Sequence, residues 1–116
     1  MTLSKLVING GADTIMKMAI TLMDLKQYQD AVKYFEMAVS ISNDIAFLKA
    51  AWNNKGLCLL RIKNYVEAIP CFRKVLSYDE KHPEATSNLN TCLGALKKLL
   101  VEINEKKRII EDILKS

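Results

Sequence analysis

Two segments of the chain carry the same pattern of residues, and this internal repeat limits the folds that the chain can adopt. Residues 28–39 and 65–76 both read Tyr, two residues, Ala, an aliphatic residue, two residues, Phe, two residues and a small or aliphatic pair. The second copy follows the first by 37 residues, from Tyr28 to Tyr65. Repeats with a period of roughly 20–50 residues are typical of solenoids, in which each unit buries its apolar face against the next.

The spacing within each copy is that of an amphipathic helix. Ala31, Phe35 and Ala38 are separated by four and three residues, which places them on one helical face, and Ala68 to Val75 repeat this spacing. Another apolar stripe precedes each copy: Ile15, Met18, Ala19, Leu22 and Met23 in the first unit, and Trp52, Gly56, Leu59 and Leu60 in the second. Each unit is therefore predicted to be a helix, a tight turn and a second helix.

Local signals between these stripes set the expected helix bounds. Ser42, Asn43 and Asp44 favour a turn and the start of a helix. Pro83 suits the first position of a helix, and Glu84 suits the positive end of its dipole. The sequence predicts helices over residues 11–25, 28–42, 46–61, 65–78 and 83–114, with residues 2–9 as either a short helical turn or an extended arm.

The repeated pattern resembles the tetratricopeptide repeat, a unit of 34 residues that carries W-x2-L-G-x2-Y, then A-x3-F, then a proline. The second unit has Trp52, Gly56, Ala68 and Phe72 at the family's spacing, whereas Lys55, Leu59 and Glu80 depart from it. The first unit lacks the tryptophan but matches at Ile15, Met18, Ala19, Leu22, Ala31 and Phe35. The three residues beyond the family's period fit between Asn43 and Lys49.

The resemblance implies a single all-α domain over residues 1–116, a helical-repeat solenoid of two such units followed by a long C-terminal capping helix. Repeat one spans about residues 12–45, repeat two about 49–82, and the capping helix about 83–114. A third complete unit is not expected, because Glu102 and Lys106 stand where it would need Ala and Phe.

The family resemblance also implies a function, since the first helices of such units line a concave groove that recognises peptides. We expect a scaffold or adaptor that binds a partner protein's peptide or amphipathic helix, and methionines suit such a groove. Some of these apolar residues could instead pack under the N-terminal arm or against a second copy. The predicted peptide-groove residues are Met16, Lys17, Ile20, Met23, Asn53, Asn54, Leu57, Leu60, Arg61, Asn88 and Thr91.

The residues of this chain argue against one known class of ligand for the family. Some members grip acidic C-termini with a Lys/Asn/Asn/Lys/Arg clamp. The corresponding positions here are Met16, Ile20, Asn54, Glu84 and Asn88, of which only Asn54 matches. Glu84 would repel an acidic tail.

The capping helix offers a second contact surface. Leu89, Leu93, Leu96, Leu100, Ile103, Ile110 and Leu114 follow a four-three spacing, which is typical of a coiled-coil seam with Lys107 as its interruption. A helix of about 15 residues in the repeats would cover only about half of this segment. The alternatives are a homo-oligomer, docking to another protein, a bend near Asn104, or cover by further chain. The predicted self-association residues are Leu96, Leu100, Ile103, Ile110 and Leu114.

Other function classes find little support in the sequence. There is no Gly-rich phosphate loop, GxSxG or HExxH, so neither catalysis nor a cofactor is expected. His82 has no partner at metal-ligand spacing, and no metal site is predicted. A net charge of +4 without aromatic interleaving does not favour nucleic acid. Neither a membrane span nor a signal-peptide core is apparent, and Cys58, Cys71 and Cys92 read as small buried hydrophobes of a cytoplasmic protein.

Overall fold

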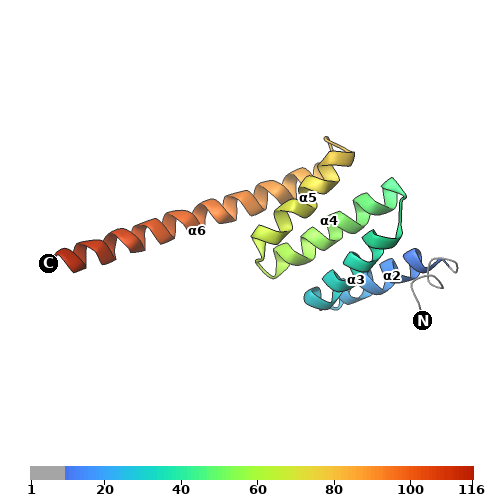
Figure 1. Ribbon diagram of the computed structural model, residues 1–116, viewed down its shortest axis with the longest axis horizontal. Coiled ribbons are helices and arrows are strands. Elements are labelled where there is room, and N and C mark those ends of the chain that lie inside the picture. The colour runs from blue at the N-terminus through green and yellow to red at the C-terminus, as the bar shows by residue number, and fades with distance from the viewer. Residues whose placement is uncertain (1–9) are drawn as a thin grey trace.

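The computed structural model describes residues 10–116, and this part of the chain forms five α-helices without strands (Figure 1). The helices are α2 (Gly11–Asp24), α3 (Tyr28–Ile41), α4 (Ile45–Arg61), α5 (Tyr65–Tyr78) and α6 (Pro83–Lys115). These elements confirm the predicted helices, and no bound differs by more than one residue. The structure predicted for residues 2–9 lies outside the described residues. None of the described helices is both long enough and apolar enough to cross a membrane.

The turn inside each repeat has the same backbone conformation. Lys26 and Lys63, which are equivalent in the two copies, adopt left-handed conformations with φ of 61° and 63°. The amide of the next residue then reaches back into the helix: Gln27 donates to the Leu22 carbonyl at 2.8 Å, and Asn64 donates to that of Leu59 at 2.8 Å. This is the Schellman arrangement that ends many helices, here with lysine where glycine is usual.

The residues beyond the family's period lie in α4. This helix has 17 residues, whereas α2 has 14, so the extra residues add to a helix rather than to a loop. Asp44 caps it, because its carboxylate accepts a hydrogen bond from the Phe47 amide at 3.0 Å. The longer helix leaves Ile45 exposed at its first turn.

The repeated alanines and phenylalanines form the core. Ala31, Phe35, Ala68 and Phe72 have no solvent-exposed surface. The first phenylalanine packs in a cluster of α2, α3 and α4, and the second packs in a cluster of α4, α5 and α6, while Val32 contacts both clusters. All three cysteines are buried and unpaired, as predicted. The small residues thus let helices approach closely while aromatic rings fill the space around them.

Gly56 lies on the face of α4 that packs against Phe72 and Cys71 of α5. A Cβ added there would lie 2.7 Å from Cε1 and 2.8 Å from Cζ of Phe72, and 3.0 Å from the Cβ of Cys71. Real Cβ atoms do not approach so closely, and the buried ring of Phe72 has little room to withdraw. Ala19 occupies the equivalent position in the first unit, so the second unit packs its helices more tightly here.

We expect Gly56→Ala to lower the free energy of unfolding by about 1–3 kcal/mol, because overpacking outweighs the better helix propensity of alanine. Gly94→Ala is the matched control, since nothing lies within 4 Å of a Cβ added at Gly94. That control should stabilise the protein by up to about 1 kcal/mol. Urea unfolding followed by circular dichroism measures both changes, and equal stabilisation by the two substitutions would contradict the close approach.

The last helix extends well beyond the repeats. It lies beside α5 over its first half and then runs on alone to the C-terminus (Figure 1). The molecule therefore measures 69 × 32 × 22 Å. The helix is continuous through Asn104, which argues against the alternative in which the end bends back there.

Candidate functional site

The first helix of each unit and the long terminal helix lie next to one another. In addition to the contacts between consecutive helices, α2 contacts α4 and α4 contacts α6. The predicted groove residues all lie on these three helices. Lys17, Arg61 and Thr91 are exposed, and the half-buried members are Ile20, Met23, Asn54, Leu57, Leu60 and Asn88.

Two of the predicted groove residues are buried instead. Met16 is 9% exposed and packs in the core cluster of the first unit, and Asn53 is 6% exposed. Nδ2 of Asn53 donates a hydrogen bond to Oε2 of Glu84 at 3.1 Å, which joins α4 to the first turn of α6. Its Oδ1 is buried and accepts no hydrogen bond within the described chain. These two side chains therefore serve the packing between helices and present little surface to a ligand.

Three of the predicted groove residues line a common hollow of about 270 Å³. Met23 of α2 lies there with Leu57 and Arg61 of α4, and Asp24 and Tyr28 complete its wall together with Lys26. The surface combines two apolar side chains with both signs of charge. It is suited to one turn of an amphipathic helix, with its apolar residue against Met23 and Leu57.

A larger hollow of about 780 Å³ lies between α2 and α3, and Lys17 is the one predicted groove residue that lines it. Its apolar wall consists of Met18, Leu22 and Tyr34, and the first two belong to the apolar stripe of the first unit. Met18 is 44% exposed. The equivalent residue in the second unit, Lys55, contacts Glu36 of the preceding unit at 3.4 Å. Unit one has no preceding unit among the described residues, which explains the exposure of Met18.

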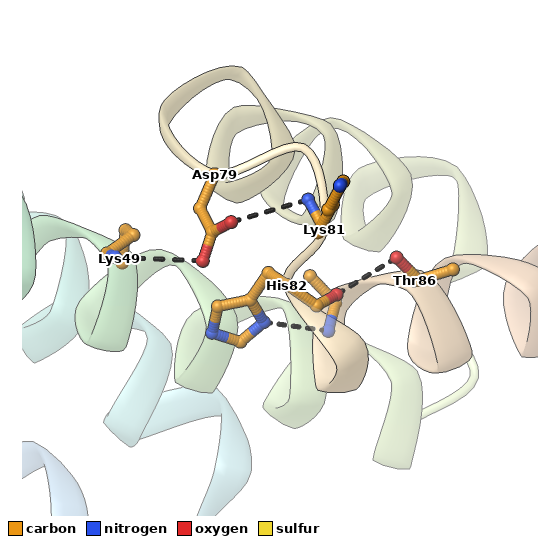
Figure 2. Close-up of polar contacts among 6 residues, drawn as sticks. Lys49, Asp79, Lys81, His82 and Thr86 are labelled. Atoms are coloured by element: carbon orange, nitrogen blue, oxygen red, sulfur yellow. Dashed lines mark hydrogen bonds and ion pairs between the residues drawn. The ribbon is translucent and has the colours of Figure 1, made fainter.

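His82 has a structural role at the start of α6 (Figure 2). Its Nδ1 accepts a hydrogen bond from the Ala85 amide at 3.1 Å, and its carbonyl accepts one from the Thr86 hydroxyl at 2.9 Å. Asp79 stabilises the same loop by pairing with Lys49 of α4 at 3.7 Å. Within residues 10–116, no three His, Cys, Asp or Glu side chains are grouped so that they could hold a metal ion.

Burial makes the three cysteine thiols weak acids and therefore poor nucleophiles. Burial raises the pKa of both Cys58 and Cys71 from 9.0 to about 11. Burial also raises the pKa of Cys92. All three thiols are therefore neutral at physiological pH, and the thiolate form that a nucleophile needs is disfavoured.

The second half of α6, residues 97–115, is exposed at every position, and we call it the free half. Among the described residues 10–116, its ion pairs join residues of the same helix: Arg108 with Glu105 at 2.6 Å and Lys107 with Glu111 at 4.0 Å. Eight large apolar side chains of the free half are exposed: Leu99, Leu100, Val101, Ile103, Ile109, Ile110, Ile113 and Leu114. Monomeric proteins rarely expose so many large apolar side chains on one helix.

Comparison with known proteins identifies the repeated unit. Two family models described as tetratricopeptide repeat match the chain, one over residues 12–45 and one over residues 50–82. Together they cover more than half of the chain. No curated protein and no solved structure matches the chain.

Proposed function

Because this chain belongs to the tetratricopeptide repeat family, whose units are generally non-catalytic protein–protein interaction modules, we propose that it binds a peptide or amphipathic helix of a partner protein. The proposed site is the face formed by α2, α4 and α6. The observation that carries this proposal is the hollow where Met23, Leu57 and Arg61 meet. An apolar side chain of the ligand would enter this hollow, while Arg61 pairs with an acidic residue beside it.

The apolar and polar side chains on this face favour a helical ligand that carries both apolar and acidic residues. Ile20 and Leu60 extend the apolar surface, and half-buried Asn54 and Asn88 offer hydrogen-bonding amides along it. Glu84 at the start of α6 opposes an acidic C-terminus. A ligand with an apolar stripe and a few acidic residues near Arg61 fits these features better than an acidic tail does.

A second candidate function is self-association through the free half of α6. It is supported by the exposure of Leu100, Ile103, Ile110 and Leu114, four of the five residues predicted for this role. The fifth, Leu96, is half-buried at the point where α6 leaves the repeats. The free half makes no contact that would cover these side chains within the described chain.

The groove proposal is tested with a displayed library of amphipathic helical peptides. We expect selected peptides to shift the amide resonances of α2, α4 and the first half of α6. Leu57→Asp should weaken their binding by roughly tenfold or more, because it puts a charge in the apolar hollow. Val66→Asp is the matched control, since Val66 is exposed on α5. Resonance shifts confined to α3 and α5, or equal losses from both substitutions, would refute the proposed site.

A further inference from the structure

The apolar face of the free half continues the face that α6 packs on the repeats. Ala85 and Cys92 are fully buried against α5 and α4, and Leu96 is half-buried. Ile103, Ile110 and Leu114 follow Leu96 at intervals of seven, seven and four residues, so they lie on the same helical face. These last three residues are 60%, 57% and 80% exposed. The face is therefore built for burial along its whole length, but α5 is too short to cover its second half.

We propose that a second copy of this chain covers the free half, with the two α6 helices antiparallel. This inference rests on the self-association proposed above and specifies the partner, its direction and its register. The two free halves overlap over about 19 residues, or roughly 28 Å of helix. The repeats of the two copies then lie at opposite ends of the paired helices.

The position of α5 excludes the parallel arrangement. In each copy α5 packs on the apolar face of α6 as far as Cys92, and Leu96 one turn further on is half-buried. Two parallel helices paired on this face would bring both α5 helices into the space between them. In the antiparallel arrangement the partner's helix ends beside Leu96, where α5 begins its cover. The apolar face of each copy is then occupied first by its own α5 and afterwards by the partner's helix.

The seam residues of the free half match one another in the antiparallel direction. Centring the pair on Glu105 places Leu96 opposite the partner's Leu114 and Leu100 opposite the partner's Ile110. Ile103 faces the aliphatic stem of the partner's Lys107. In a parallel pair Lys107 would instead face its own copy across the seam. The antiparallel register thus separates the two lysine ammonium groups that interrupt the seam.

The flanking residues favour the same register. On one flank Lys97 lies two positions from direct opposition to the partner's Glu111, close enough for a flanking ion pair, and the twofold symmetry makes this attractive pair occur twice. On the other flank Leu99 lies two positions from direct opposition to the partner's Ile113, which extends the apolar contact. Lys106 lies directly opposite the partner's Asn104 and two positions from the partner's Lys106, so the two lysines near the centre are the unfavourable element. Four attractive flanking contacts thus oppose one repulsive contact.

Sedimentation of the full chain at micromolar concentrations tests whether a dimer forms. We expect a dimer for the unmodified chain and at least about 100-fold weaker association for Ile103→Asp, which places a carboxylate in the seam. Val101→Asp is the matched control, because Val101 is 67% exposed on the opposite face of the same helix. Circular dichroism should show unchanged helix content in both variants. A monomeric unmodified chain, or equal loss of association by both variants, would overturn the proposal.

Cysteine cross-linking separates the antiparallel pair from any other dimer. We expect a mixture of the Leu100→Cys and Ile110→Cys chains to form disulfide-linked dimers under mild oxidation, while each chain alone does not. Cross-linking of Leu100→Cys with itself would show a parallel pair, which overturns this inference but leaves self-association standing. Lys97→Glu and Glu111→Lys should each weaken the dimer several-fold, and the combined substitutions should restore it. Failure of that restoration would contradict the register.

Discussion

Replacing Phe72 with alanine is expected to lower the free energy of unfolding by about 3–5 kcal/mol, one of the largest effects expected in this fold. The ring has no exposed surface and touches both the backbone region of Gly56 and the cluster that joins α4, α5 and α6. A domain of this size has a total stability on the order of 5–15 kcal/mol, so a large share would be lost.

Urea unfolding monitored at the helical dichroism band measures this loss. Val66→Ala on the same helix is the control, because Val66 is exposed, and its effect should stay within about 0.5 kcal/mol. Adding Gly56→Ala to Phe72→Ala gives a further check. The glycine substitution should cost less in that background, because its Cβ then enters the cavity left by the ring. A loss below about 1 kcal/mol for Phe72→Ala would contradict the role of this ring in the core.

The substitution Asn53→Asp is expected to cost about 3–5 kcal/mol at neutral pH, although it changes only one side-chain group. The amide nitrogen that donates to Glu84 at 3.1 Å is replaced by an oxygen, and the new carboxylate is buried beside an existing one. Burial and the neighbouring charge would both raise the pKa of the new carboxyl above its unfolded value near 4. When the new carboxyl group is protonated, in contrast, its O–H can donate a hydrogen bond to Glu84.

The pH dependence of Asn53→Asp follows from that raised pKa. Below about pH 4 both states carry the proton and the deficit relative to the unmodified chain is small. As pH rises towards the folded-state pKa, only the unfolded state ionises freely, and the deficit grows to its full size. Asn54→Asp is the control, since Asn54 is half-buried and makes no hydrogen bond to Glu84. A deficit of Asn53→Asp that is the same at pH 4 and pH 7 would contradict the buried pairing.

The helices and the repeat could be predicted from the sequence because their signals are local. The spacing of Ala31, Phe35, Ala68 and Phe72 sets which helical face is buried, and this holds whatever else the chain contacts. The end of the repeat pattern after Pro83 could be predicted for the same reason. Such periodic signals carry little information about side chains at the edge of the buried face.

The exposure of individual site residues depended on neighbours that no local signal specifies. Met18 belongs to the apolar stripe of the first unit, but it lies on the side of α2 that a preceding unit would cover, and it is exposed. Met16 and Asn53 were assigned to an open groove and are buried, the second through a contact with Glu84 that is 31 residues away in sequence. The left-handed backbone conformations of Lys26 and Lys63 could not be predicted either, because a glycine is the usual sequence signal for that turn.

The order in which the helices contact one another also bears on how the chain folds. The largest packing interfaces join helices that are consecutive in sequence, from α2 with α3 to α5 with α6. Little loop-closure entropy is lost before such contacts form, so fast folding is expected, as in other chains of low contact order. A folding nucleus can form in either repeat unit, α2 with α3 or α4 with α5, and the remaining helices then add to it. The helices α2 and α6 each have one large partner only among the described residues, so they should detach before the central helices when the native state opens locally.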